Sequence, residues 1–223
     1  MKTPLNADTL RQHFTYSWWK YLLAGLLAFG LVDIVLSMTA YRVPPEKKIE
    51  FFVYGQMDQS GALEKYLESV RENEMPEMEE IACQMLMADD TYGPMQLMTF
   101  LAAGEGDVYL LPREEFISNA ANGSLVALES DAKLMDIFDR AGASLQTGWR
   151  KNTEIGETHL YGIPQSKLPG LARYAYAEDG YLCVFINNGN EENVMAFLRI
   201  FCRDMIKETE PEPVPTPVTE PAA

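Results

Sequence analysis

The chain has 223 residues, of which 33 are acidic and 18 basic, and its formal net charge at pH 7 is −15. This length is enough for one ordinary folded domain beside a membrane segment. The acidic balance argues against binding to nucleic acid and against docking of the folded part on an anionic lipid surface, because both need clustered lysine and arginine.

Residues 21–41 form an apolar stretch with a single formal charge, Asp33. A helix of this length reaches about 30 Å at a rise of about 1.5 Å per residue, which matches the hydrocarbon core of a bilayer. Trp18 and Trp19 precede the stretch and Tyr41 ends it, and such aromatic side chains favour the headgroup level. We therefore expect a transmembrane helix whose membrane contacts include Trp18, Trp19, Asp33 and Tyr41.

A cleaved signal peptide is the alternative interpretation of residues 21–41. The apolar run is longer than the roughly 7–15 residues of a signal core, and no clear small-residue cleavage site follows it. These features favour an uncleaved anchor. A carboxylate near mid-membrane costs about 2.5–3.5 kcal/mol on insertion scales. Asp33 therefore either contacts a polar group of a partner helix or is tolerated because the rest of the helix is strongly apolar.

The basic residues on the two sides of this stretch predict its orientation. Residues 1–20 contain Lys2, Arg11 and Lys20 beside Asp8, whereas the basic residues after the stretch are mixed with glutamates. The small excess of positive charge on the amino side indicates a cytoplasmic head of residues 1–20. We expect a single-pass protein of the cell membrane whose main domain is extracytoplasmic.

The next segments open a domain of mixed α and β structure. Residues 42–48 contain two prolines, which predicts a stiff, extended linker. The apolar, aromatic and β-branched run at 49–55 predicts a buried strand, and apolar residues at helical spacing predict a helix over 62–72. Residues 77–88 fit a helix face and strand alternation equally well, so their periodicity leaves both alternatives open.

The remaining segments continue the alternation of helices and strands. The glycines at 104 and 106 precede a strand instead of following one, so they do not form a dinucleotide-binding fingerprint. The acidic, proline-rich composition of residues 208–223 predicts a disordered tail. The expected helices are 93–103, 112–119, 132–142 and 191–207. The expected strands are 108–111, 157–163 and 181–186, and a hairpin turn at 153–157 precedes the second of these strands.

Four short motifs, in this order, resemble the first lobe of the extracellular solute-binding proteins of ABC transporters. They are LAAGEGDVYLL at 101–111, GSLVAL at 123–128, YGIP at 161–164 and NNGNEENVMAFL at 187–198. The resemblance implies that residues 79–87 are a strand. It also implies that residues 49–207 form a three-layer α/β domain like one lobe of a periplasmic-binding-protein fold. Only residues 165–180 stand where such a protein has its second lobe.

The resemblance also implies where a solute would bind. Ligands of open α/β sheets lie at the carboxyl ends of the strands. Tyr54 and Gln56 follow the first predicted strand, Tyr109 lies near the end of another, and Gln165 follows the YGIP motif. Trp149 offers a further stacking face. These five side chains are the predicted contacts of a solute.

Sequence motifs for catalysis, cofactors or metals are not found. The two histidines, His13 and His159, accompany no nucleophile or metal-ligand spacing. Cys83, Cys183 and Cys202 lie in apolar runs, which favours three buried thiols, although a disulfide with one remaining thiol is allowed outside the cytoplasm. We therefore expect a protein that is not an enzyme and holds no cofactor.

The sequence favours a membrane-anchored module that captures a solute or assists a transporter. Its expected partners are the lipid bilayer, a transporter or another membrane protein, and a small solute such as a sugar or peptide, but not nucleic acid. The alternative is a structural or interaction protein of the cell envelope that keeps the lobe fold and has lost small-molecule binding.

Overall fold

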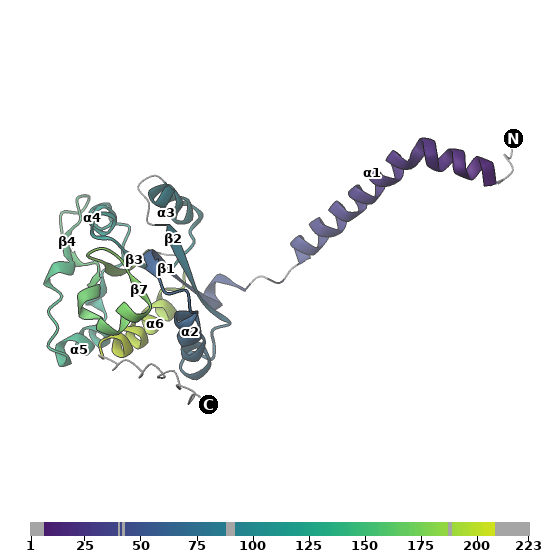
Figure 1. Cartoon of the computed structure of the whole chain (residues 1–223). Coiled ribbons are helices and arrows are strands. Elements are labelled where there is room, and N and C mark those ends of the chain that lie inside the picture. The colour runs from purple at the N-terminus through teal and green to yellow at the C-terminus, as the bar shows by residue number, and fades with distance from the viewer. Residues whose placement is uncertain (1–6, 40, 42, 88–91, 187–188, 208–223) are drawn as a thin grey trace, which may run out of the picture. The chain divides into compact units, whose positions relative to one another are not determined.

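The computed structural model describes residues 7–39, 41, 43–87, 92–186 and 189–207, with the backbone alone at 7–17. The chain divides into two compact units, Met1–Arg42 and Val43–Ala223, which are coloured along the chain in Figure 1. The predicted tail at 208–223 lies outside the described residues.

In the first unit, helix α1 runs from Ala7 to Thr39. Its segment Trp18–Thr39 has 22 residues and a mean hydropathy of 2.1, and it is therefore long and apolar enough to cross a membrane. Trp18, Trp19 and Asp33 are exposed on this helix, and Tyr41 is exposed just after it. A membrane anchor and a signal sequence near the amino terminus share these properties, so the predicted membrane contacts stay predictions.

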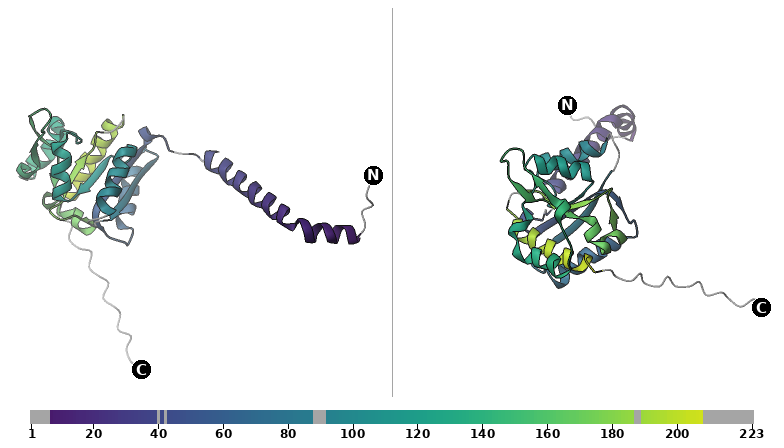
Figure 2. Two further views of the ribbon diagram at one scale, coloured as in Figure 1. Left: turned by 90° about the horizontal axis from the view of Figure 1, so that it is seen from above. Right: turned by 90° about the vertical axis from the view of Figure 1, so that its left-hand side faces the viewer.

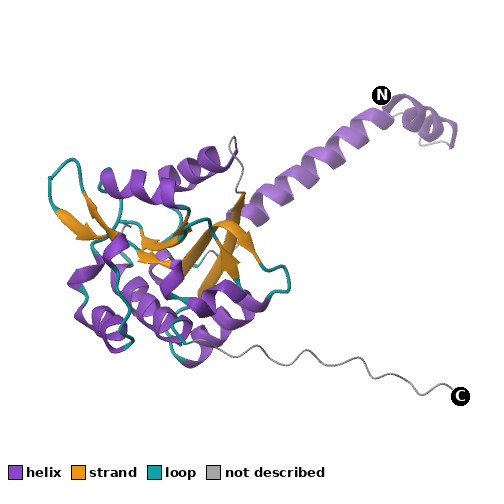
Figure 3. Cartoon of the chain, turned by 60° about the vertical axis from the view of Figure 1, so that its left-hand side comes forward, coloured by secondary structure: helices purple, strands orange, loops and turns teal. Residues whose placement is uncertain are grey.

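The second unit is built on a six-stranded sheet, drawn in orange in Figure 3. Its strand order is β2-β1-β3-β8-β6, and β7 pairs with the end of β1. Strands β2 and β3 are parallel to β1, whereas β8 runs antiparallel to β3 and β6 antiparallel to β8. The bounds are β1 Lys48–Met57, β2 Glu80–Met87, β3 Val108–Leu111, β6 Ile163–Pro164, β7 Ala175–Tyr176 and β8 Tyr181–Val184.

Helices cover both faces of the sheet, as Figure 2 shows, which confirms the predicted three-layer α/β fold. One face packs against α2 Ala62–Asn73, α5 Ala132–Arg140 and α6 Glu191–Met205. The other face carries α3 Tyr92–Ala103 and α4 Arg113–Ala121 over an aromatic cluster. Side chains along β1 alternate between the two hydrophobic layers. Phe51 and Val53 point to the first face, and Phe52 and Tyr54 point to the second.

Most predicted elements are confirmed within one or two residues, including the strand β2, which periodicity alone left open. The predicted strand at 157–163 is wrong, because the chain turns between two sheets at this point. Its first part is β5 Thr158–Leu160, which forms a hairpin with β4 Trp149–Lys151, whereas Ile163 belongs to the main sheet. Glycine at 162 allows the chain to pack against Phe116 here, since a Cβ would lie 2.6 Å from the ring of Phe116.

The predicted extended linker needs a correction as well. Pro45–Lys47 form a short 3₁₀ helix, closed by the Lys47 N–H bond to the Pro44 carbonyl at 2.9 Å. Proline fits this position because its fixed φ suits the first turn of a helix. Further 3₁₀ helices are Leu128–Ser130, Gln146–Gly148, Gln165–Lys167 and Pro169–Arg173.

The three cysteines are free thiols. Cys183 and Cys202 are fully buried, as predicted, and burial raises the pKa of both. Cys83 is only half-buried on the edge strand β2. Burial, together with the nearby Glu64 carboxylate, raises its pKa to about 12, so the thiolate form is scarce at neutral pH.

Candidate functional site

Residues 165–180 partly cover the side of the sheet where the parallel strands β1, β2 and β3 end, which we call the carboxyl edge. Strand β1 continues past this edge, where Gln56 pairs with Tyr176 and Met57 with Ala175 of β7. The Asp58 N–H donates to the Tyr174 carbonyl at 2.7 Å, and the Arg113 N–H donates to the Glu178 carbonyl at 3.3 Å. Residues 165–180 are therefore bonded to the carboxyl edge of the sheet.

Gln165 holds this covering segment in place. Its side-chain Nε2 donates to the Ala175 carbonyl at 2.7 Å, and its Oε1 accepts the Ala177 N–H at 3.1 Å. Its own N–H donates to the Gly180 carbonyl at 2.8 Å. Because Gln165 is only 8% exposed and its amide is engaged, it supports the site from within and does not reach a solute.

Close backbone contact at this edge requires glycine at two positions. A Cβ on Gly55 would lie 2.2 Å from the Tyr176 carbonyl oxygen, and a Cβ on Gly180 would lie 2.6 Å from Gln165 Oε1. Real Cβ atoms do not approach other atoms so closely, so β7 could not pair with β1 if a side chain stood at Gly55. These glycines determine the shape of the edge.

A pocket of about 630 Å³ remains open between β1, the start of α4 and the covering segment. Among the described residues, its charged side chains are four carboxylates and one guanidinium. Arg113 lies 3.8 Å from Asp179 in an exposed ion pair. The excess of negative charge disfavours anionic solutes. The side chains that line it are Tyr54, Gln56, Pro94, Pro112, Arg113, Glu114, Glu115, Tyr176, Ala177, Glu178 and Asp179.

The structure brings two of the five predicted solute contacts into this pocket, Tyr54 and Gln56. Gln56 is exposed, whereas Tyr54 is nearly buried and its hydroxyl fills the space beside Gly93. Trp149 lies elsewhere, in a shallower hollow with α5. Of the three aromatic side chains in the predicted site, only Tyr54 lines the pocket.

Tyr109 is the clearest departure from the predicted site. Its side chain is fully buried between Phe52, at 5.0 Å between ring centroids, and Phe185, at 4.7 Å. Its hydroxyl donates to the Glu105 carbonyl at 2.8 Å, and burial raises the pKa of the phenol. Tyr109 packs the core, so no surface of it is available to a solute.

Sequence reasoning missed Tyr176, Arg113 and Asp179. Tyr176 is 55% exposed on the two-residue strand β7, which is too short to produce a periodic pattern. Arg113 could have been predicted from the sequence, because it begins the helix that directly follows a buried strand and therefore lies at the carboxyl edge. Asp179 adopts a positive φ of 44°, which marks a tight turn beside the pocket.

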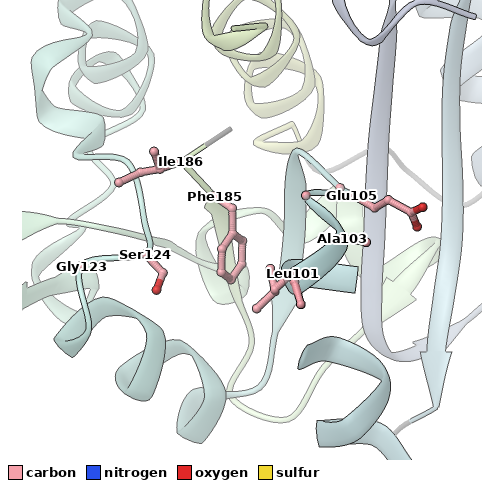
Figure 4. A pocket seen from close by; sticks show the side chains of 10 residues that line it. Leu101, Ala103, Glu105, Gly123, Ser124, Phe185 and Ile186 are labelled. Atoms are coloured by element: carbon pink, nitrogen blue, oxygen red, sulfur yellow. The ribbon is translucent and has the colours of Figure 1, made fainter. Parts of the chain in front are cut away.

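A second pocket, of about 540 Å³, lies at the opposite edge of the sheet. Figure 4 shows Phe185 between Ser124 and Leu101 in this pocket, with Glu105 pointing away from Phe185. Glycines and apolar side chains line it, and Glu105 is its one charged residue. It offers fewer directional polar groups than the carboxyl-edge pocket, which is therefore the better candidate for specific binding.

His159 and Glu129 form a cluster of titratable side chains outside both pockets. His159 Nδ1 lies 2.5 Å from Glu129 Oε1, and Glu129 Oε2 accepts the Leu160 N–H at 2.9 Å. The hydrogen bond to Glu129 raises the pKa of His159. The cluster ties the β4–β5 hairpin to Leu128–Ser130, and the part of the chain that the structure describes contains no group of three or more His, Cys, Asp or Glu suited to a metal ion.

No protein-family model and no curated protein matches this chain. Among solved structures, it is similar to an extracellular solute-binding protein family 1 from Alicyclobacillus acidocaldarius subsp. acidocaldarius DSM 446. The identity is 21% and the TM-score 0.41, over 56% of this chain and 28% of that chain.

Two structures of an N-glycan transport solute binding protein from Streptococcus pneumoniae are also similar, one of them in complex with Man1GlcNAc. Their identities are 17% and 16% and their TM-scores 0.37 and 0.35, over 52% of this chain and 24% of that chain. The chain thus spans about a quarter of the length of these proteins. It is similar, over about half of its own length, to the solute-binding proteins that its sequence motifs resemble.

Proposed function

We propose that this protein is a membrane-anchored, extracytoplasmic binding module that holds a small solute in the carboxyl-edge pocket. One observation carries the proposal. Separate segments of the chain place exposed polar and aromatic side chains, Gln56, Arg113, Tyr176 and Asp179, around a single hollow at the strand ends. Such convergence at the carboxyl edge is typical of binding sites in α/β sheets.

The anchor gives the proposal its location. Residues 1–20 would form a cytoplasmic head, 21–41 the membrane span and 42–48 a linker to the domain at 49–207, followed by the tail at 208–223. Strand β1 begins at Lys48, at the edge opposite the pocket. The chain therefore enters the domain away from the carboxyl-edge pocket, which supports an anchored domain whose pocket is free to receive a solute.

The chemistry of the pocket favours a neutral or cationic polar solute, such as a sugar or a short peptide. The exposed ring of Tyr176 offers a stacking face, and the carboxylates with Gln56 offer acceptors for hydroxyl or amine groups. Because the pocket is open on one side, it buries less of a ligand than the 70–90% that is usual in a closed site. We therefore expect weak binding unless another protein or domain closes over the ligand.

A thermal-shift screen of the full chain in detergent micelles tests the proposal. The panel contains monosaccharides, N-glycan fragments, short peptides and amino acids. A ligand at a hundred times its Kd adds about 2.7 kcal/mol, which raises the Tm of a domain of this size by about 5–10 °C. Tyr176→Ala and Gln56→Ala should abolish the shift, whereas Gln146→Ala, an exposed glutamine outside the pocket, should keep it. No shift with any class would contradict the proposal.

A structural or interaction role is the second candidate, and the covering segment favours it. Residues 165–180 bond the edge where a second lobe would otherwise leave a cleft. In this alternative the pocket is only the gap left beside that segment, and the protein acts through its surface. A chain that melts cooperatively and responds to no solute would support this role.

A further inference from the structure

Helix α3 is unusual among the helices of the domain because none of its 12 residues is charged. A helix that is apolar all round is ordinarily covered on all sides. Only Gly93 and Leu97 are fully buried, whereas Tyr92, Met95 and Met98 are 64–66% exposed. The chain itself therefore covers one side of α3 and leaves the other open.

Strand β2 continues this open surface. It is the first strand in the order of the sheet, and no strand in the described part of the chain pairs with its outer edge. From Ile81 to Met87 it contains no charge and no proline, the residues that commonly protect such an edge. The Met87 N–H donates to Gln96 Oε1 of α3 at 3.2 Å, which joins strand edge and helix into one β2–α3 surface.

The charge distribution singles out this surface for contact between like molecules. Residues 42–223 carry a net charge of −16, so two copies repel each other in most orientations. The β2–α3 surface is uncharged from Ile81 to Met87 and from Tyr92 to Ala103. Two acidic copies can therefore meet along these two segments without a carboxylate on either of them, whereas Asp89 and Asp90, which connect the segments, lie outside the described residues.

We propose that the β2–α3 surface is a twofold interface between two copies of this chain. The β2 strands pair antiparallel about Cys83, so that Ile81 lies opposite Met85 and Ala82 opposite Gln84. In this register no charged side chain faces another from Ile81 to Met85. A protein strand satisfies the free N–H and C=O groups of the edge, which a lipid surface cannot do.

The size of the surface suits a small, reversible contact between two copies. A stable interface uses about 20–30 residues on each side and buries about 800 Å² of each partner. Of the twenty residues in β2 and α3, sixteen are at least partly exposed, because Ile81, Leu86, Gly93 and Leu97 are buried, so the contact falls just below that range. Exposed methionines suit such a surface, because their flexible side chains adapt to a partner.

Helix α2 gives the proposed dimer a recognisable salt dependence. Glu64, Glu68 and Glu72 line the groove beside Cys83 together with Lys65, and Arg71 pairs with Glu68 and Glu72. The net charge of this helix face stays negative, so a twofold axis there brings two negatively charged faces closer together. Salt screens this repulsion, with a Debye length of about 10 Å at 0.1 M and about 3 Å at 1 M. The dimer should therefore strengthen as the salt concentration rises.

Sedimentation equilibrium of the full chain in density-matched detergent tests the proposal. We expect a monomer–dimer equilibrium that shifts toward dimer between 0.1 and 1 M salt. Met85→Lys places a charge on the edge strand of both copies and should raise the dimer dissociation constant at least about tenfold. Ile155→Lys makes the same change in charge at an exposed site in the β4–β5 hairpin and should leave the constant unchanged.

Cross-linking then locates the contact, in a Cys83→Ser background. Gln84→Cys should form a covalent dimer with a linker of about 8 Å, because diagonal neighbours in an antiparallel pair lie about 7–8 Å apart. Ile155→Cys should not. A chain that stays monomeric at every concentration overturns the proposal. A dimer that persists in the Met85→Lys variant also overturns it, because association would then be driven by α1. A monomer whose Met95 contacts lipid would assign the surface to the membrane instead.

Discussion

The helices on the two faces of the sheet bury very different shares of their apolar side chains. On one face, α6 keeps its charged residues on the outside and buries the stripe Val194, Phe197, Leu198, Phe201, Cys202 and Met205. On the other face, α3 has no charged residue and fully buries only Gly93 and Leu97. An apolar stripe opposite a polar face specifies packing that one chain completes alone. An uncharged helix that is half open specifies packing that needs another molecule.

Removing an aromatic ring from each helix tests this difference between α6 and α3 with the largest expected effect. Phe201 of α6 is 1% exposed and its ring packs against Phe51 at 5.4 Å between centroids. Phe201→Ala should lower the free energy of unfolding by about 3–5 kcal/mol, through lost burial and a residual cavity. Phe100→Ala on α3, where Phe100 is only half-buried, should cost clearly less in the same urea titration. Equal losses would show that both helices are completed within the chain.

The carboxyl edge depends on one buried amide instead of an apolar stripe. Gln165→Met keeps the volume but leaves the Ala175 carbonyl and the Ala177 N–H without partners. We expect a loss of about 1–3 kcal/mol and faster hydrogen exchange at residues 174–180. Unchanged exchange there would mean that the pairing of β7 with β1 holds the segment without Gln165.

The His159–Glu129 contact predicts a smaller, pH-dependent effect at the edge of the domain. The hydrogen bond to Glu129 raises the pKa of His159 in the folded state. The stabilisation is therefore fully present below about pH 6.5, the ordinary pKa of histidine, and is lost as the pH rises through the folded pKa. The Tm difference between wild type and His159→Gln should be largest at low pH. A difference that grows with pH would contradict this sign.

The smallest expected effect concerns the open side of α3. In a Met85→Lys background, which keeps the chain monomeric, Met95→Gln with Met98→Gln should change the free energy of unfolding by less than about 0.5 kcal/mol. Both side chains are 66% exposed, so the monomer gains little from them. A larger loss in urea unfolding would show that they pack within the chain.

Much of the fold could be predicted because most of its elements carry a clear period or a clear end. Strand β1 reads as one apolar run, α6 has a complete stripe, and the glycines at 104 and 106 mark the turn before β3. The strands of two or three residues were missed or merged, since β4 and β7 were not predicted and β5 and β6 were predicted as parts of one strand. They lack a period, and their existence depends on tertiary contacts such as the close approach of Gly55 to Tyr176.

The candidate site could be predicted only in part, for a related reason. The strand order places Gln56 and Tyr54 at the carboxyl edge, where the resemblance to solute-binding proteins predicted a site. The orientation of a side chain near a strand end is decided by packing, so Tyr109 and Gln165 turn inward and Tyr176 turns outward. Residues that face a pocket from a short, aperiodic segment leave no signal in a single sequence.

Hydrogen exchange of the full chain in lipid nanodiscs, with and without the strongest ligand from the screen, tests the central claim most directly. The carboxyl-edge pocket predicts slower exchange at residues 55–57 and 174–180, with no change at residues 104–106 and 123–124 of the opposite pocket. Protection confined to the opposite pocket would contradict the proposed site. The absence of protection with every ligand would contradict a solute-binding role.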